Sequence, residues 1–402
     1  MSADRATIRT TSRTTNWTTS GATSRATSWP PDWATRWCGA RRILCVRLDS
    51  LGDVLMCTPA IRALRASLPG CHLTLLTSPS GAAVAPYVPE LDAVMPFVAP
   101  WMKHEHAAGA EALRACAGQL AAQGFDAAII FTSYSQSPLP AAMLCHLAGI
   151  PLRLACCREN PYRLLTHWVA ETEGERATRH EVQRQLDLVA QVGCTTPDTT
   201  LSFAVPPEAQ RRVHALLADG GIDPAAPYLV LHAGASAPSR RYPLRHWLVL
   251  IGMLGTRLGY PMLLTGDRGE AEALRPLAET WVGPVHSLIG KLDLGELGAL
   301  VGSAALLLTG NTGPAHIAAA LGTPLVDLYA LTNPQHTPWR VAHRLLFHDV
   351  SCRNCLRSSC PLGHHACLDQ LAPAVVAEAA SELLGTALPR PARTDDVALA
   401  FA

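Results

Sequence analysis

The chain has 402 residues, about two to three times the commonest domain size, which predicts two domains. Hydrophobic residues make up 49% and charged residues 16%, so the chain has apolar material for two cores and is not disordered throughout. The net charge of +1 gives no global field that attracts nucleic acid, and we expect no nucleic-acid partner. No apolar run reaches the roughly 18–20 residues that cross a bilayer, and no signal segment opens the chain, so we expect neither a membrane-spanning nor a secreted protein.

Residues 1–40 are rich in Thr and Ser, with scattered arginines and Trp17, Trp29, Trp33 and Trp37 as the large apolar groups. No helical or strand period holds, so we expect a disordered extension. Two alternatives stay open: an Arg/Trp arm that touches an anionic membrane surface, and a mistaken start site.

Short apolar runs then alternate with longer amphipathic segments, which is typical of parallel strands covered by helices on both faces. The predicted strands are 43–48, 72–77, 93–97, 127–131 and 152–155, and the predicted helices are 54–68, 107–123, 140–148 and 181–192. A polar, Pro-bearing stretch at 194–207 is the predicted linker.

A second series of the same kind follows the linker. Its predicted strands are 228–232, 262–265, 304–308 and 325–329, and its predicted helices are 245–258, 270–281, 294–301, 315–321 and 374–384. The sequence therefore predicts an N-terminal domain at 41–205, a C-terminal domain at 206–385 and a loose tail at 386–402, with each domain a doubly wound α/β unit. Ligands bind beyond the carboxyl ends of such strands, so two facing domains would share a cleft.

The first predicted strand runs into Asp49-Ser50-Leu51-Gly52-Asp53. Gly52 permits a tight strand-to-helix turn, and Asp53 opens the helix, where free N–H groups stabilise a carboxylate. Asp53 is either an N-cap or a base that accepts a proton from a bound hydroxyl. The loop matches neither GxGxxG nor a P-loop, which disfavours a dehydrogenase or an NTPase.

In the second unit, the loop Gly234–Pro243 contains Ser236, Arg240 and Arg241 after a strand. Such a loop suits a phosphate, although a solvated turn has the same composition.

The segment Thr309–Ala320 is the strongest single motif. A strand ends in a Gly-bearing turn and Pro314 lies in the first turn of the next helix. We expect outward N–H groups around Thr312, Gly313 and Ala315 to form an anion site for a diphosphate. His316 either adds a donor there or is simply packed in the helix.

Taken together, Leu51-Gly52-Asp53, Gly234–Pro243, Gly266…Glu270 and Thr309–Ala320 resemble glycosyltransferase family 9, the lipopolysaccharide heptosyltransferases. The resemblance covers roughly residues 41–385. It implies a GT-B fold, an acceptor-binding N-terminal domain and a C-terminal domain that holds a nucleoside-diphospho-sugar. It also implies ADP-heptose as donor, transfer without a metal, and inversion at the anomeric carbon.

The resemblance also assigns roles to residues that match its motifs. Asp53 corresponds to the catalytic base, and Arg47 stands where many members have a lysine near the acceptor cleft, beside Gly52. The donor-binding positions that it implies are Ser236, Arg240, Glu270, Asn311, Thr312 and Gly313. Arg240 replaces a phosphate-binding lysine, which keeps the charge but changes its geometry. Asn311 replaces an acidic residue that contacts the donor sugar, so the sequence leaves that sugar open.

Four cysteines lie close together near the C-terminus: Cys352, Cys355, Cys360 and Cys367, with His364 and His365 among them. Four thiolates can form a closed, structural zinc site. Reduced thiols or a local disulfide, and an iron–sulfur cluster, are the alternatives. The remaining cysteines are scattered and are expected to be small core residues.

The sequence thus predicts an inverting glycosyltransferase that acts in the cytoplasm, with peripheral contact at the inner face of the membrane, on a lipid-linked or cell-envelope glycan acceptor. One alternative is a sugar-nucleotide epimerase or hydrolase of similar shape, which the lack of a paired acid near Asp53 disfavours. The other is a zinc-stabilised nucleic-acid-binding protein, which the near-zero net charge disfavours.

Overall fold

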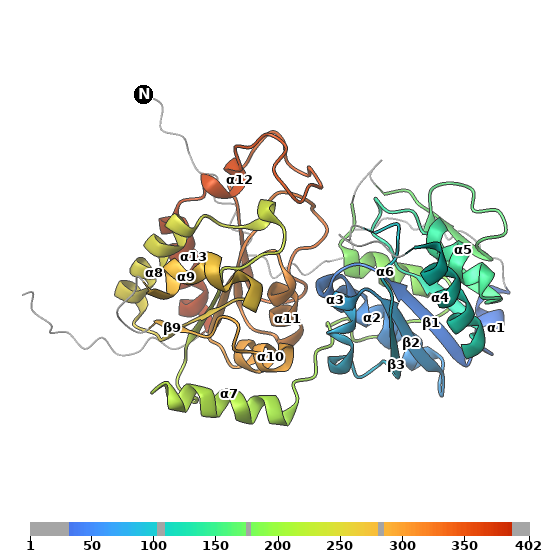
Figure 1. Ribbon diagram of the computed structural model, residues 1–402, viewed down its shortest axis with the longest axis horizontal. Helices are drawn as coiled ribbons and strands as arrows, with labels where there is room; N and C mark the ends of the chain where they lie inside the picture. The colour runs from blue at the N-terminus through green and yellow to red at the C-terminus, as the bar shows by residue number, and fades with distance from the viewer. Residues whose placement is uncertain (1–31, 103–108, 174–177, 280–284, 388–402) are drawn as a thin grey trace, which may run out of the picture.

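The computed structural model describes residues 32–102, 109–173, 178–279 and 285–387, which form two α/β lobes side by side (Figure 1). The lobe drawn in blue and green contains the N-terminal half, and the lobe in yellow to red contains the C-terminal half. Across these residues, no helix has both the length and the apolar character that crossing a membrane requires.

The N-terminal half is built on a six-stranded sheet in which every strand pair is parallel. Its strands are β1 (Arg42–Arg47), β2 (His72–Thr77), β3 (Ala93–Pro96), β4 (Ala127–Ile130), β5 (Leu152–Cys157) and β6 (His167–Ala170). Its helices are α1 (Trp33–Trp37), α2 (Leu51–Ser67), α3 (Pro79–Ala82), the 3₁₀ turn η1 (Ala85–Tyr87), α4 (Ala110–Gln123), α5 (Leu139–Leu147) and α6 (Glu181–Ala190). The buried runs of β1 and β4 have no exposed residue, as strands covered on both faces require.

The C-terminal half contains a second six-stranded parallel sheet. Its strands are β7 (Leu229–His232), β8 (Met262–Thr265), β9 (Val285–Ser287), β10 (Leu306–Gly310), β11 (Leu325–Leu328) and β12 (His343–Leu346). Its helices are α7 (Pro207–Asp219), η2 (Pro238–Arg240), α8 (Leu244–Leu258), η3 (Arg268–Glu270), α9 (Ala271–Glu279), α10 (Leu294–Gly302), α11 (Gly313–Leu321), α12 (Ala366–Asp369) and α13 (Pro373–Ala387).

Both sheets have the same strand order. It is β3-β2-β1-β4-β5-β6 in the N-terminal half and β9-β8-β7-β10-β11-β12 in the C-terminal half. The order reverses between the first and fourth strand of each sheet, and crevices for ligands open at such points beyond the carboxyl ends of the strands. The segments that the sequence singles out follow β1 in one half and β7, β8 and β10 in the other. The predicted doubly wound, GT-B-like architecture is confirmed.

Three edge or near-edge strands were not predicted, namely β6, β9 and β12. Each is only three or four residues long and mixes polar with apolar side chains, so none shows the continuous apolar run of a central strand. Helix α7 was also missed, because the linker interpretation placed a boundary at its first turn.

The expected disordered extension is wrong at its C-terminal end. Residues 33–37 form α1, and Trp37 is fully buried, with its ring 5.8 Å from that of His167 on β6. Burying this aromatic surface offsets the entropy of ordering the turn. The expected tail also begins later than predicted, because α13 continues to Ala387. Residues 1–31 and 388–402 lie outside the described residues.

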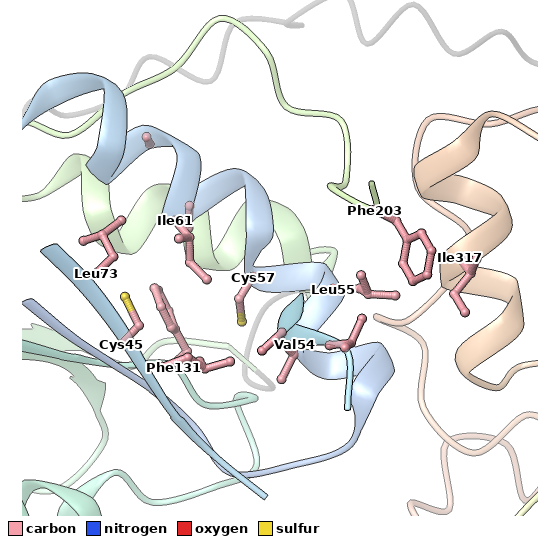
Figure 2. Close-up of a cluster of buried hydrophobic side chains, with 14 of the residues drawn as sticks. Cys45, Val54, Leu55, Cys57, Ile61, Leu73, Phe131, Phe203 and Ile317 are labelled. Atoms are coloured by element: carbon pink, nitrogen blue, oxygen red, sulfur yellow. The ribbon is translucent and has the colours of Figure 1, made fainter. Parts of the chain in front are cut away.

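Two hydrophobic clusters contain residues of both halves, while two others each belong to one half. Figure 2 shows Val54 and Leu55 of α2 on one side of the junction. Ile317 of α11 lies on the other side, together with Phe203 from the segment that precedes α7. Gly298 of α10 makes room for the Phe203 ring, since a Cβ there would lie 2.3 Å from Cε1. The α2–α11 contact therefore sets the start of α2 against the start of α11.

Candidate active site

Asp53 lies in the first turn of α2, directly after the carboxyl end of β1. Ser50 is the N-cap and Asp53 is the third helical residue, so the N-cap interpretation of Asp53 is wrong. The Ser50 amide and hydroxyl both donate to Asp53 Oδ2, at 3.1 and 2.6 Å. This capping box uses one carboxylate oxygen and turns the other, Oδ1, towards the junction.

Arg47, the last residue of β1, holds three carboxylates although its side chain is only 1% exposed. Its Nη2 donates to Asp53 Oδ1 at 3.1 Å and its Nη1 to Glu181 Oε1 at 2.5 Å. Its Nε lies 2.8 Å from Asp49 Oδ2. Gln185 Nε2 also donates to Glu181 Oε1, at 2.8 Å. One guanidinium thus fixes the position of Asp53 through a network that is almost closed to water.

The network separates the pKa values of its two aspartates. Burial alone would raise the pKa of Asp53, but Arg47, His336 and the Ser50 hydrogen bonds hold it far below its usual range. Burial outweighs Arg47 at Asp49 and raises its pKa to about 6. Asp53 therefore remains a carboxylate at neutral pH.

The loop after β7 forms a second group of polar side chains. Ser236 is exposed, and Arg240 at the end of η2 donates from Nη1 to the Asn311 carbonyl at 3.1 Å. Glu270 lies against the same loop, because a Cβ at Gly234 would be 1.9 Å from Glu270 Oε2. Glu270 is held by a reciprocal capping box with Asp267. These predicted donor-binding residues thus share one edge of the C-terminal sheet.

The N-terminus of α11 completes this edge. Thr312 is its N-cap and Pro314 lies in its first turn, as predicted. The expectation of free N–H groups at Thr312 and Ala315 is wrong in this arrangement: they donate to the Gly310 and Thr312 carbonyls at 2.8 and 3.1 Å. The side chain of Asn311 is buried, and its Oδ1 has no hydrogen-bond partner among the described residues.

His316 lies on the first turn of α11 and faces the other half. Its Cδ2 would be 2.7 Å from a Cβ at Gly52, so the ring contacts the residue next to Asp53. Burial, with the nearby His336, lowers the pKa of His316 to about 3. The ring is therefore neutral, and its buried Nδ1 has no hydrogen-bond partner in the described part of the chain. Gly313 comes even closer to Leu51, where a Cβ would lie 2.3 Å from Cδ2.

A polar cavity of about 90 Å³ opens beside the network, beyond the carboxyl ends of β4 and β5. Its lining consists of Tyr134, Ser135, Gln136, Ser137, Cys156, Arg158, Glu159 and Glu171. Gln136 connects the cavity to the network, because its Nε2 donates to Asp49 Oδ1 at 2.6 Å. Hydroxyl, amide and charged groups in one hollow suit a hydroxyl-rich ligand.

The cysteine cluster is arranged differently from a metal centre. All four thiols are free and partly exposed, and Cys352 Sγ lies 3.8 Å from His364 Nε2. Across residues 32–387 as described, no three His, Cys, Asp or Glu side chains gather closely enough to hold a metal ion. The predicted zinc ligands Cys352, Cys355, Cys360 and Cys367 thus do not fit a tetrahedral site as they lie.

The same segment instead supports η2. Ser239 donates from its amide to the Ser358 carbonyl at 3.0 Å and from Oγ to the Arg357 carbonyl at 2.8 Å. His365 Nε2 lies 2.6 Å from the Ser239 carbonyl. These bonds fix the residue that precedes Arg240.

The family model for glycosyltransferase family 9 (heptosyltransferase) matches residues 113–366, more than half of the chain. The chain belongs to glycosyltransferase family 9. It is 26% identical to lipopolysaccharide heptosyltransferase 1 of Escherichia coli K12 over 302 residues, which cover 73% of this chain and 89% of that protein.

Solved structures agree on the fold of this family 9 glycosyltransferase. A family 9 glycosyltransferase from Veillonella parvula has a TM-score of 0.70 at 24% identity, over 86% of this chain and 98% of that one. The Escherichia coli ADP-heptose lipopolysaccharide heptosyltransferase II has a TM-score of 0.67 at 21% identity, over 86% and 99%.

Sequence reasoning missed three parts of the site in this family 9 enzyme: Asp49, Glu181 and His336. Asp49 stands in the loop that was singled out, but no pattern distinguishes it from a solvated turn residue. Glu181 and His336 reach Arg47 and Asp53 from 134 or more residues away, and no local signal marks them.

Proposed function

We propose that this family 9 glycosyltransferase transfers a heptose or a related sugar from an ADP-linked donor to a lipopolysaccharide-type acceptor, with inversion at the anomeric carbon. The observation that carries the proposal is Asp53, which Arg47 and Ser50 keep ionised where the two halves meet. A carboxylate in that position accepts the proton of an attacking hydroxyl.

The leaving group is a nucleoside diphosphate, which gains negative charge as the glycosidic bond breaks. Arg240 supplies a fixed positive charge at the loop after β7, and the N-terminal end of α11 adds its dipole. Because these groups supply the positive charge, we propose that transfer needs no metal ion. Ser236, which is exposed in the same loop, is the further phosphate contact that we propose.

The donor nucleotide rests on the edge of the C-terminal sheet. Glu270, close against Gly234, offers a carboxylate to the ribose hydroxyls. Asn311 has a neutral amide at the position where a charged carboxylate is expected from the resemblance. Its unpartnered Oδ1 is able to accept a hydrogen bond from a neutral hydroxyl of the donor sugar. ADP-heptose as donor is favoured by the relatives, one of which is named as an ADP-heptose lipopolysaccharide heptosyltransferase.

The acceptor enters from the N-terminal half. The polar cavity at Gln136 and Arg158 is where we propose that the acceptor glycan binds. Gln136 also donates to Asp49, which shares the Arg47 guanidinium with Asp53. Attack from this side meets the anomeric carbon on the face opposite the diphosphate, and direct displacement inverts the centre. We propose that the enzyme works in the cytoplasm, at the inner membrane surface where a lipid-linked acceptor is found.

Transfer from ADP-heptose to a delipidated lipopolysaccharide core tests the proposal. The isosteric change Asp53→Asn keeps the capping hydrogen bonds but removes the base, so we expect kcat to fall by about 10²–10⁴-fold. ADP affinity, measured by calorimetry, should stay within about twofold, because the nucleotide contacts lie in the other half. Product with retained anomeric configuration, or an Asp53→Asn enzyme with normal kcat, would refute the proposal.

A further inference from the structure

Two buried polar atoms face each other across the junction with no hydrogen-bond partner among the described residues: Glu181 Oε2 and His336 Nε2. They lie 3.9 Å apart, and His336 Nε2 is also 3.9 Å from Asp53 Oδ1. The ring therefore stands between the base and the carboxylate that shares Arg47 with it. Such unpaired groups are costly when buried, so their alignment calls for an explanation.

The hydrogen bonds around Asn333 indicate which nitrogen of His336 carries the proton. Its Nδ1 lies 2.9 Å from Asn333 Nδ2, while the Thr332 hydroxyl donates to Asn333 Oδ1. This arrangement orients the Asn333 amide so that its NH₂ donates to Nδ1. The neutral ring then has its proton on Nε2, which points at the two carboxylates.

His336 reaches this position from the C-terminal half, on the segment between β11 and β12. Two contacts fasten that segment to the start of α6: the Glu181 amide donates to the Gln335 carbonyl at 3.0 Å, and His180 Nε2 lies 2.8 Å from the Thr337 carbonyl. The sheet that carries the donor-binding loops thus also carries a hydrogen-bond donor for the base.

The charge balance around Arg47 favours a further hydrogen-bond donor beside Glu181 and Asp53. Three carboxylates surround the single guanidinium of Arg47, and Glu181 Oε2 is left without a proton to accept. Arg47 and Arg240 lower the pKa of the ring as well, and His336 in turn lowers the pKa values of His316 and His180. Burial lowers the pKa of His336 although Asp53 and Glu181 raise it, so the ring acts as a neutral donor.

We infer that His336 is a positioning residue that couples docking of the donor-binding half to the alignment of Asp53. An approach of about 1 Å would bring Nε2–H within hydrogen-bond distance of both Asp53 Oδ1 and Glu181 Oε2. Closure of the half that we propose holds the nucleotide thus adds a hydrogen bond from His336 to a carboxylate that Arg47 and Ser50 already hold. This inference rests on the proposed function.

Three variants test it: His336→Phe, which removes the donor; His336→Gln, which keeps an N–H; and the surface control His214→Gln on α7. We expect His336→Phe to lower kcat by about tenfold or more, with ADP affinity and acceptor KM within about twofold of the natural enzyme. His336→Gln should recover much of the loss, and His214→Gln should change nothing. Normal kcat in His336→Phe, or an equal loss in the Phe and Gln variants, would overturn the inference.

A measurement without turnover separates this inference from the proposed function. In histidine-¹⁵N-labelled protein, ADP should slow the exchange of the His336 Nε2 proton, and Asp53→Asn should shift its resonance. A silent ring in the presence of bound ADP refutes the coupling even if heptose transfer is normal. If the enzyme transfers no heptose but ADP still slows the exchange of the His336 Nε2 proton, ADP-heptose is not the donor sugar nucleotide. The inferred link between the donor-binding half and Asp53 is then still supported.

Discussion

Gly52 packs directly against the imidazole of His316, so that a β-carbon at residue 52 would lie only 2.7 Å from Cδ2. Gly52 belongs to the turn that carries Asp53, the proposed base, and His316 belongs to the helix at which we propose that the donor phosphates bind. The two halves meet here without any side chain at residue 52 between them. The close approach links the Leu51-Gly52-Asp53 and Thr309–Ala320 motifs, which the sequence shows only as separate segments.

Gly52→Ala should push the halves apart, because the His316 ring is buried and has little room to move. We expect a loss of about 1–3 kcal/mol in the free energy of unfolding and a drop of about tenfold or more in kcat/KM. The double variant Gly52→Ala/His316→Ala should recover much of the stability. Gly118→Ala on α4, where a Cβ meets nothing within 4 Å, is the matched control and should be neutral or slightly stabilising.

Arg47→Met should destabilise the fold strongly, because it leaves three carboxylates around a site that is closed to water. Removing one partner of a buried ion pair costs about 3–5 kcal/mol, and urea unfolding measures it. Glu181→Gln should cost much less, since Arg47 keeps Asp49 and Asp53. Equal losses for the two variants would contradict a network centred on Arg47.

Asp49 should make stability depend on pH in the direction opposite to most aspartates. Burial raises its folded pKa to about 6, above the unfolded value, so the folded state binds an extra proton between pH 4 and 6. The free energy of unfolding of the natural protein, relative to Asp49→Asn, should therefore fall by up to about 3 kcal/mol as pH rises through that window, and stay constant above it. Unfolding of both proteins at several pH values gives this difference, and a constant difference from pH 4 to 7 would be the contrary result.

Arg240→Met should weaken ADP binding by about tenfold or more, because it removes the fixed charge beside the diphosphate. Arg240→Lys keeps the charge and should lose only a few-fold. Arg245→Met, which breaks a surface ion pair with Asp369, serves as the control and should leave ADP binding unchanged. Calorimetry decides between these outcomes, and unchanged affinity in Arg240→Met would place the phosphates elsewhere.

The exposure of the cysteines predicts how many thiols react in the native protein. Cys38 and the four cluster cysteines are at least partly exposed, and the other eight are buried. Titration with a chromogenic disulfide should detect 5 thiols in the native protein and all 13 after unfolding. Cys360 should react early: burial would raise its pKa, but the surrounding backbone N–H groups lower it overall. A native count that rises only after a chelator is added would show a metal on the cluster.

The positions of the functional loops were predictable from the sequence because their signals are local. Continuous apolar runs mark β1, β7 and β10, and Gly52, Pro314 and the Ser/Arg loop mark the turns that follow. The short edge strands β6, β9 and β12 were not predictable, since three or four mixed residues give no period. The helix at Trp33–Trp37 was not predictable either, because its stability depends on burial of Trp37 near β6.

The sequence by itself determined the two α/β halves, the loops that carry Asp53, Arg240 and Asn311, and the family resemblance. The halves and the loops follow from patterns within about 20 residues, and the resemblance follows from four such motifs taken together. Only the tertiary structure decided how those loops are used. It brought Glu181 to Arg47, His336 to Asp53 and His316 to Gly52. The reason is physical: ionisation, burial and close approach depend on atoms that are far apart in the chain, and folding alone sets their distances.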